Sequence, residues 1–357
     1  MNELEQWRQE IDRIDSTIVK AINERYGLVM KIGEWKRAHH QPIYVPEREA
    51  ALLEKLSREN TGPMPEMTLR AIYAEIISGS RRLERPLTVA CLGPDGTFSA
   101  EAARMRFGHA AELVMVKSLP DVFLEVESGR ADLGCVPVEN GVGGVVNPTL
   151  DTLRETPLSI VSEWYVPIHH MLLGSGPIDR IECIYSHPQV FSQCRKFLAA
   201  NFPKVSLLEV ASSARAAEMA SRDPGFAALA GRSAAEKFHL QILVENIEDD
   251  SRNATRFLAV APNPAGQSGR DKTSFCFSLQ DRAGALCDAL KIIADAGLTM
   301  TFIESRPLRA TCGEYCFFVD VLGHREEGPV AAALDKLAAI STSIKVFGSY
   351  PAAEVRR

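Results

Sequence analysis

The sequence lacks the features that mark membrane, secreted and nucleic-acid-binding proteins. It has no apolar run long enough to span a bilayer, and its first residues show no basic stretch followed by an apolar one, so we expect no signal peptide. No basic stripe stands out among the 357 residues, and the formal net charge is −6, which argues against nucleic acid as the main partner. We therefore expect a cytoplasmic protein with neither membrane nor nucleic-acid partners.

Signatures of disulfides and metal sites are also missing. The 8 cysteines include no Cys-x-x-Cys pair, and the histidines show no metal-ligand spacing. Most of the cysteines lie in apolar stretches, which is typical of reduced, buried thiols. Cys312 and Cys316, with His324 beyond them, come nearest to a metal site, but the pattern does not favour one. We expect no metal and no cofactor.

Proline is absent from residues 3–38, and that segment holds only two glycines. Apolar residues recur there with heptad spacing, from Leu4 to Trp35, which predicts a helix with a coiled-coil-like seam. At 1.5 Å per residue the helix would be about 50 Å long. A small domain cannot bury so long a stripe, so we expect the helix to pack against a second subunit. Arg25 interrupts the seam, and a guanidinium on an apolar face needs an anion or acid as partner.

Two further helices are predicted, one opened by Pro46 and one over about 66–84. This all-helical set resembles the chorismate mutases in which two chains interlock. The resemblance implies that arginines and a lysine hold the carboxylates and the ether oxygen of chorismate, and that Arg8 crosses from the partner chain. The matching substrate-binding positions are Arg8, Arg25, Arg48, Glu49 and Ser80, and the matching catalytic positions are Lys36 and Glu84.

Two positions depart from that pattern. Val45 stands where many relatives have an aspartate that touches the substrate hydroxyl, which leaves Glu49 to make that contact. Glu84 stands where many have glutamine, and a carboxyl group must keep its proton to donate a hydrogen bond. The rearrangement is intramolecular, so cations and one hydrogen-bond donor suffice. Because of these departures, a helical domain that serves only for dimerisation remains an alternative.

In residues 87–264, strand-like runs alternate with helical ones, which predicts α/β layers. Ligands of such sheets gather at strand ends and adjoining helix starts, and four motifs lie at such places. Taken singly, each has a plain structural explanation, such as a turn or a helix cap. The motifs are Gly93–Thr97, Val138-Glu139-Asn140, Ser186-His187-Pro188-Gln189 and Asn253–Phe257.

In this order and at this spacing, the motifs resemble prephenate dehydratase, where they surround one crevice between two α/β lobes. The resemblance implies that Thr255 is the acid that helps the ring hydroxyl leave and that Arg256 pairs with a substrate carboxylate. The residues expected to orient the substrate are Glu139, Asn140, Ser186 and Gln189. A ligand-binding receptor is a rival interpretation, because solute-binding proteins also have two-lobed crevices. The missing export signal and the fused helical domain count against it.

After an expected flexible linker at residues 263–270, the order strand, helix, two strands, helix, strand predicts a ferredoxin-like α+β fold. It resembles an ACT domain. Two segments match those that hold phenylalanine between paired ACT domains; they contain Gly284, Ala285 and Leu286, and Glu304, Ser305 and Arg306.

The sequence therefore predicts a multidomain protein: an all-α chorismate mutase domain (1–86), a two-lobed α/β dehydratase domain (87–264) and a ferredoxin-like ACT regulatory domain (271–357). The resemblance implies conversion of chorismate to prephenate and of prephenate to phenylpyruvate, with loss of water and CO2. It also implies feedback inhibition by phenylalanine, in a homodimer or a higher homo-oligomer.

Overall fold

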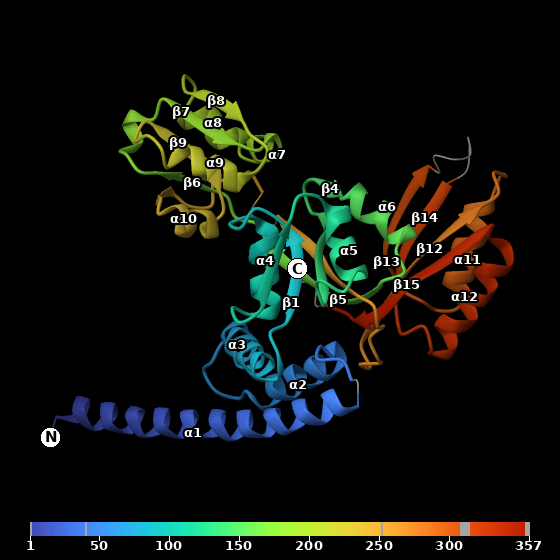
Figure 1. Cartoon of the computed structure of the whole chain (residues 1–357). Coiled ribbons are helices and arrows are strands. Elements are labelled where there is room, and N and C mark those ends of the chain that lie inside the picture. The colour runs from blue at the N-terminus through green and yellow to red at the C-terminus, as the bar shows by residue number, and fades with distance from the viewer. Residues whose placement is uncertain (1, 40, 251–252, 308–314, 354–357) are drawn as a thin grey trace.

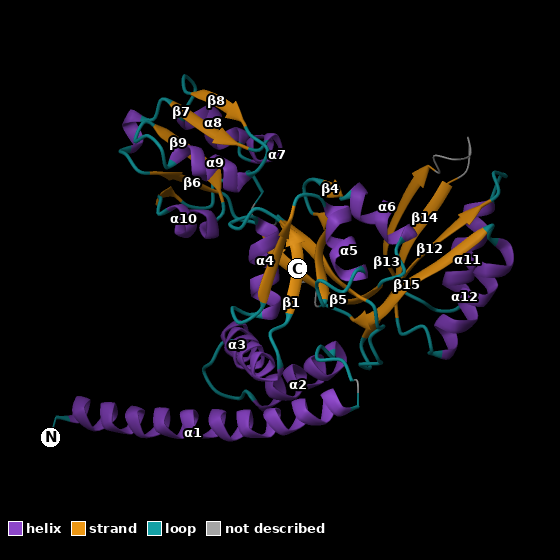
Figure 2. Cartoon of the chain, in the orientation of Figure 1, coloured by secondary structure: helices purple, strands orange, loops and turns teal. Residues whose placement is uncertain are grey.

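The computed structural model describes residues 2–39, 41–250, 253–307 and 315–353. The chain folds into a helical part, a two-lobed α/β part and a C-terminal α+β part, which follow one another along the sequence (Figure 1). Figure 2 shows the helical part beneath the two sheet-containing parts. The expected fold class is confirmed. In the described part of the chain, none of the helices has the length and apolar character needed to cross a bilayer.

The helical part consists of α1 (Glu3–Ala38), α2 (Pro46–Glu59) and α3 (Glu66–Glu84). Acidic residues begin α1 and basic residues end it, which suits the helix dipole. Glycines let α1 and α3 approach closely. A Cβ placed on Gly33 would come within 2.6 Å of Cγ of Glu84, and one placed on Gly79 would meet the hydroxyl of Tyr26.

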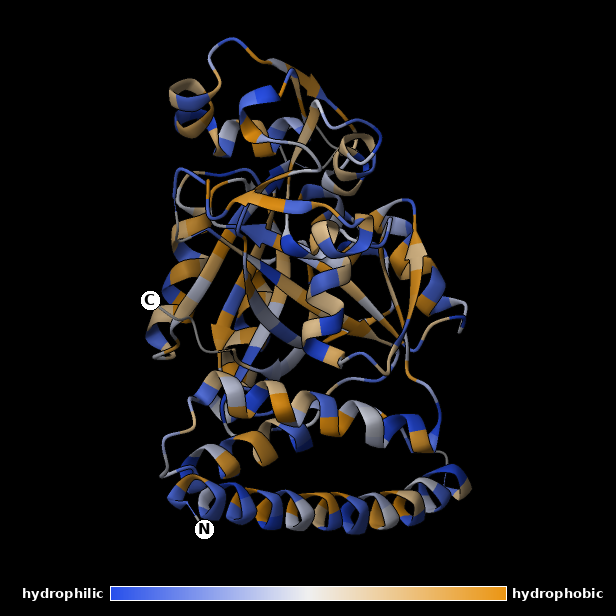
Figure 3. Ribbon diagram, turned by 90° about the vertical axis from the view of Figure 1, so that its left-hand side faces the viewer, coloured by the Kyte–Doolittle hydropathy of each residue, from blue (hydrophilic) through white to orange (hydrophobic). Residues whose placement is uncertain are grey.

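The N-terminal half of α1 extends away from the rest of the described structure. Residues 2–21 are all exposed, and the apolar seam stays open, with 63% of Trp7 and 61% of Leu28 accessible to solvent. Figure 3 shows apolar and polar residues alternating along α1, and Figure 1 shows that α2 and α3 lie over only a part of its length. Much of the seam therefore stays exposed in the described structure.

The first lobe of the α/β part, lobe 1, has a sheet in the order β2-β1-β3-β11-β5, with β4 beside β3. Strands β1, β2 and β3 are parallel, whereas β11 runs antiparallel between β3 and β5. The strands are β1 (Thr88–Leu92), β2 (Glu112–Val116), β3 (Leu133–Asn140), β4 (Gly144–Val145), β5 (Ser159–Pro167) and β11 (Ala254–Ala261). The helices are α4 (Phe98–Phe107), α5 (Leu119–Glu127) and α6 (Asn147–Glu155).

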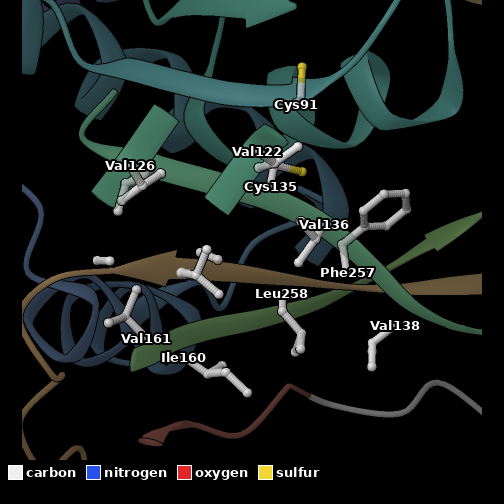
Figure 4. Close-up of a cluster of buried hydrophobic side chains, with 14 of the residues drawn as sticks. Cys91, Val122, Val126, Cys135, Val136, Val138, Ile160, Val161, Phe257 and Leu258 are labelled. Atoms are coloured by element: carbon white, nitrogen blue, oxygen red, sulfur yellow. The ribbon is translucent and has the colours of Figure 1, made fainter. Parts of the chain in front are cut away.

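The core of lobe 1 lies on both faces of its sheet, where β3 and β11 supply side chains such as Val136, Phe257 and Leu258 (Figure 4). Four of the described cysteines belong to this core, and two of them, Cys91 and Cys135, lie in the sheet of lobe 1. Burial raises the pKa of Cys91 to about 12 and that of Cys135 well above its usual value. Both are free thiols, as the apolar context predicts. Cys287 is an exception, because it is exposed.

The second lobe, lobe 2, has a sheet in the order β10-β6-β9-β7-β8. The polypeptide crosses between the two lobes twice, at residues 168–170 between β5 and β6 and again after residue 244, between β10 and β11. The amide of Ile247 donates to the carbonyl of His170 at 2.9 Å, which ties the crossings together. The strands are β6 (Met171–Gly174), β7 (Cys183–Ser186), β8 (Ser206–Glu209), β9 (Phe226–Ala230) and β10 (Gln241–Val244). The helices are η1 (Ile178–Arg180), α7 (Pro188–Gln193), α8 (Arg195–Asn201), α9 (Ser213–Ala220) and α10 (Arg232–Phe238).

The C-terminal part is an antiparallel sheet in the order β13-β14-β12-β15. Its elements are β12 (Asp271–Leu279), α11 (Ala285–Asp295), β13 (Met300–Pro307), β14 (Tyr315–Leu322), α12 (Gly328–Ile340) and β15 (Ser343–Pro351). On one face Phe275 and Phe277 pack with α11 and α12. On the other, Phe318 and Phe347 join the core of lobe 1. The alternation of side chains along each strand thus makes one sheet serve two cores.

The segment at residues 263–270 is held against both of its neighbours. Ala265 is buried in the core of lobe 1, and a Cβ on Gly266 would lie 3.0 Å from a carboxylate oxygen of Glu47. Ser268 donates to Asp271 at 2.6 Å. The segment that was expected to be a flexible linker is therefore anchored to both neighbours at these points, where its small residues allow close packing.

Candidate active sites

The pairing of β3 with β11 decides which face of the sheet each polar residue of the dehydratase motifs points to. Thr255 lies opposite Asn140, and Arg256 lies opposite Glu139. Directly opposed residues share a face of the sheet, and consecutive residues point to opposite faces. Asn140 and Thr255 therefore face one side, and Glu139 and Arg256 face the other.

The amide of Asn140 is held in one orientation. Its Oδ1 accepts from the backbone amides of Val142 at 3.1 Å and Gly143 at 2.6 Å. Its Nδ2 then donates to Thr255 Oγ1 at 2.7 Å and to Asn253 Oδ1 at 3.1 Å. Thr255 Oγ1 accepts in this bond, so its own proton remains available for another acceptor.

Helix α7 of lobe 2 contacts Asn140 and the loop that follows it. A Cβ on Gly143 would collide with the amide of Gln189, and Gln193 Nε2 donates to Asn140 Oδ1 at 3.4 Å. The sequence reasoning missed Gln193, although it follows Gln189 by one helical turn and so shares its face of α7. Ser186 is not brought to this place: it is fully buried and donates to the carbonyl of Leu229 at 2.9 Å.

Arg256 lies away from Thr255, contrary to the role expected for it. It is 3% exposed and forms ion pairs with Glu163 at 2.7 Å and with Asp320 of β14 at 2.6 Å. It also donates to the hydroxyl of Tyr350 at 3.0 Å, and Lys272 pairs with Glu163 at 2.7 Å. The alternation of β11 thus directs Arg256 into a buried charge cluster between lobe 1 and the C-terminal domain.

The turn Gly93–Thr97 also contacts lobe 2. Thr97 caps α4 by accepting from the amide of Ala100 at 3.4 Å. Lys237 of α10 donates to the carbonyl of Asp95 at 2.8 Å, and Ser233 donates to Glu101 at 3.1 Å. The two lobes therefore meet here as well as at Asn140.

In the helical part, α1 and α3 bring several predicted residues together. Arg25 is half-buried and donates to the hydroxyl of Ser80. Lys36 Nζ lies 3.9 Å from Glu84 Oε2 and donates to the carbonyl of Ile43 at 3.3 Å. Lys36, Ile43 and Glu84 line a cavity of about 330 Å³. Its volume and its cationic wall suit a small anionic ligand.

Glu49 does not face that cavity. It is buried between Arg81 and Arg106, and Arg106 Nη1 lies 3.2 Å from its carboxylate. Arg106 belongs to α4 of lobe 1 and also donates to the hydroxyl of Tyr44 at 3.0 Å. Burial lowers the pKa of Arg81 to about 10, so this side chain stays cationic at neutral pH. The structure thus uses Glu49 to join two domains.

Arg8 and Arg48 are both exposed, and neither lines the described cavity. At 1.5 Å per residue, Arg8 lies about 42 Å from Lys36 along α1. It cannot reach the cavity of its own chain.

The predicted phenylalanine-binding segments lie in the C-terminal domain. Gly284 precedes α11 with a φ of +80°, Ala285 is buried and Leu286 is half-buried. On β13, Ser305 is exposed, whereas Glu304 and Arg306 are half-buried. Arg306 pairs with Asp151 of α6 at 3.0 Å.

Lys345 adds a second contact to α6. Its Nζ donates to the carbonyls of Leu153 at 3.0 Å and Arg154 at 2.9 Å, at the end of that helix. Helix α6 begins at Asn147, shortly after β4 and the loop that follows Asn140. The C-terminal domain thus contacts α6, which lies close in sequence to Asn140 of the Asn140–Thr255 pair. No group of metal-ligating side chains is found within the described residues.

Residues 7–85 match the chorismate mutase type II family, residues 89–265 the prephenate dehydratase family and residues 276–339 the ACT domain family. A bifunctional chorismate mutase/prephenate dehydratase of Aquifex aeolicus is 44% identical over 358 residues, which cover 99% of each chain. The chain belongs to this family of bifunctional chorismate mutase/prephenate dehydratases. It is therefore an enzyme, and the receptor interpretation is wrong.

Two solved structures each match about three quarters of this bifunctional enzyme. The prephenate dehydratase from Arthrobacter aurescens in complex with L-Phe is 32% identical with a TM-score of 0.69, and the match covers 74% of this chain and 90% of that one. A protein described as a novel type of quorum quenching acylase is 31% identical with a TM-score of 0.69, and the match covers 76% of this chain and 100% of that one.

Proposed function

We propose that the helical domain converts chorismate to prephenate and that the two-lobed domain converts prephenate to phenylpyruvate, CO2 and water. The dehydratase activity is supported by the hydrogen-bonded pair Asn140 and Thr255, which lies beside α7 between the two lobes. The cavity beside Lys36 supports the first activity.

In the dehydratase, Thr255 donates its hydroxyl proton to the ring hydroxyl of prephenate. As that C–O bond breaks, the ring carboxylate leaves as CO2 and its electrons complete the aromatic ring. Asn140 leaves the threonine proton free by donating to Oγ1, and Gln189 and Gln193 close the site from lobe 2. Arg256 and Ser186 have structural roles in this scheme, because their polar atoms are committed elsewhere.

In the mutase, cations fold the chorismate dianion into a compact conformer, and stabilisation of the developing charge lowers the barrier. Arg25 and Lys36 supply the cations of one chain, and Lys36 serves the ether oxygen. Arg8 completes the site of a partner chain, because it is exposed and too distant from its own. Glu84 lies beside Lys36 in the wall of the same cavity.

The enzyme acts in the cytoplasm as a homodimer or a higher homo-oligomer. In this assembly the apolar seam of α1 packs against the same seam of a second copy of the chain. The seam's exposed residues, including Trp7 and Leu28, support this assembly. Phenylalanine binds the C-terminal domain near Gly284 and Ser305 and inhibits the dehydratase. The Arthrobacter aurescens relative in complex with L-Phe supports this ligand.

The purified full-length chain should be assayed with chorismate and with prephenate separately, with and without phenylalanine. We expect turnover of both substrates and inhibition of the second reaction. Turnover of prephenate without turnover of chorismate would favour the alternative in which the helical domain serves only for dimerisation. No turnover of prephenate would contradict the proposal.

A further inference from the structure

His170 lies in the crossing that leads from β5 to β6, and it is 1% exposed. Its backbone amide donates to Glu248 Oε2 at 2.9 Å, and the adjacent His169 Nδ1 lies 2.7 Å from Glu248 Oε1. Its ring meets Phe98 of lobe 1 edge to face, with the ring centroids 5.5 Å apart. The second crossing thus fixes the backbone of His170, and the imidazole is held inside the junction of the lobes.

A chain of hydrogen bonds runs from this imidazole to Thr255. His170 Nε2 lies 2.7 Å from Gln193 Oε1, Gln193 Nε2 lies 3.4 Å from Asn140 Oδ1, and Asn140 Nδ2 lies 2.7 Å from Thr255 Oγ1. His170 sits on the crossing, Gln193 on lobe 2, and Asn140 and Thr255 on lobe 1. The chain therefore spans both walls of the dehydratase site.

The donor and acceptor of each hydrogen bond between His170 and Thr255 can be assigned by starting from Asn140. Backbone amides of Val142 and Gly143 make Asn140 Oδ1 an acceptor, so the amide of Gln193 must present its NH2 group there. Gln193 Oε1 then faces His170, and Nε2 of the imidazole must carry a hydrogen. This direction leaves Thr255 Oγ1 as an acceptor with its own proton unused.

We propose that His170 is a positioning residue of the dehydratase: its Nε2–H group holds the amide of Gln193 in the orientation that secures Asn140 and closes lobe 2 over Thr255. It touches no substrate and transfers no proton. The inference rests on the proposed role of Thr255 as the acid.

The surroundings of His170 favour a neutral ring. Burial lowers its pKa, although the contacts with Gln193 and Glu248 oppose that effect, and His169 adds to the lowering. Its Nδ1 is buried without a hydrogen-bond partner among the described residues. A second proton at Nδ1 would therefore be an unsatisfied buried donor.

Two substitutions separate the hydrogen bond from the packing. His170→Phe keeps an aromatic ring against Phe98 but removes the donor, and His170→Gln keeps an N–H group near the position of Nε2. Because a buried amide loses its partner, we expect His170→Phe to lower dehydratase kcat by about 10- to 100-fold, with KM changed less than about threefold. His170→Gln should stay within about threefold of the wild type. Unchanged mutase activity in the same molecules shows that they are folded.

A double-mutant cycle with Gln193→Met distinguishes positioning from general stability. In the Gln193→Met background the amide that accepts from His170 is absent, so His170→Phe should cause no further loss of kcat. The effects of substituting residues that contact each other in one network are not additive. His169→Gln is the matched control in the same crossing, and we expect it to stay within about threefold of the wild type. The proposal would be overturned by a wild-type kcat in His170→Phe. It would also be overturned if the kcat losses of His170→Phe and Gln193→Met added in full in the double variant.

The wild-type enzyme offers a test without substitution. The 15N chemical shifts of labelled histidines should assign His170 to the neutral Nε2–H tautomer, with His170→Gln identifying the signal. An Nδ1–H tautomer would contradict the proposed bond. Normal turnover in Thr255→Val would overturn the acid assignment itself. An inactive Thr255→Val beside a fully active His170→Phe would overturn only the role of His170.

Discussion

Thr255 and Arg256 are consecutive residues of β11 whose side chains serve different domains. Thr255 Oγ1 accepts a 2.7 Å hydrogen bond from Asn140 beside lobe 2, and Arg256 forms a 2.6 Å ion pair with Asp320 of the C-terminal domain. One peptide unit therefore connects the proposed catalytic hydroxyl to the domain interface. A ligand that binds two arrangements of that interface with different affinity would shift both residues together.

Replacing Thr255 by valine should remove the dehydratase acid while conserving side-chain volume. Positioned acid catalysis contributes about 10²–10⁴-fold, so kcat for prephenate should fall within that range. Thr255→Ser, which restores a hydroxyl, should recover most of the rate. Mutase turnover of the same molecules is the internal control, since the cavity proposed for that reaction lies in the helical domain.

Arg256→Met should weaken the interface of lobe 1 with the C-terminal domain. It leaves Asp320 and Glu163 buried with one cation fewer, and breaking a buried ion pair costs roughly 3–5 kcal/mol. The midpoint of urea unfolding should drop accordingly. Arg282→Met is the control, because it removes a 2.7 Å pair with Asp288 in which both side chains are about half exposed. Equal effects of the two substitutions would contradict the role of the buried cluster.

Asp151→Asn should uncouple phenylalanine binding from inhibition. It breaks the 3.0 Å pair with Arg306 on β13 and so loosens the contact with α6, which follows the loop after Asn140. Calorimetry should find phenylalanine affinity little changed, while its inhibition of the dehydratase weakens by about fivefold, within the usual range of coupling energies. Asp179→Asn, in the exposed helix η1 of lobe 2, should leave inhibition intact.

Truncation is a poorer test of regulation than Asp151→Asn. Phe318 and Phe347 of the C-terminal sheet belong to the core of lobe 1, so deleting residues 271–357 would uncover apolar surface there. Loss of activity in such a truncated chain would not separate regulation from folding.

Glu84→Gln should raise mutase activity. A carboxylate has no proton to donate to the ether oxygen and repels the charge that develops there, whereas glutamine always donates. We expect kcat/KM for chorismate to be higher in Glu84→Gln than in the wild type. Dehydratase rates of both proteins serve as the control. Equal mutase kcat/KM in the two proteins would mean that Glu84 does not touch the substrate.

His170 should make folding less favourable in mild acid. Its pKa is lowered in the folded chain, chiefly by burial, so the unfolded chain binds the proton more tightly. The resulting stability is present above the ordinary histidine pKa of about 6.5 and is lost as pH falls toward the folded value. His170→Gln should therefore show a shallower loss of Tm below about pH 6.5 than the wild type. Identical slopes would mean that His170 is not held neutral.

Local patterns in the sequence already contain much of this architecture. The heptad spacing from Leu4 to Trp35 and the absence of proline predict a helix over residues 3–38, and the structure has α1 at Glu3–Ala38. Alternating strand and helix runs predict the α/β class. Helix periodicity, caps and turns are set by residues close in the chain, so they can be read without tertiary information.

The partners of the polar side chains were decided only by the tertiary structure. The sequence places Thr255 and Arg256 together, but the register of β11 and the docking of the C-terminal domain send Arg256 to Asp320. Glu49 likewise meets Arg106 of another domain, and the link from His170 through Gln193 to Asn140 crosses two lobes. Such contacts depend on strand register and domain packing, which join residues far apart in the chain. The sequence alone therefore determined the order and class of the domains, and packing between them determined which charged and polar groups face each site.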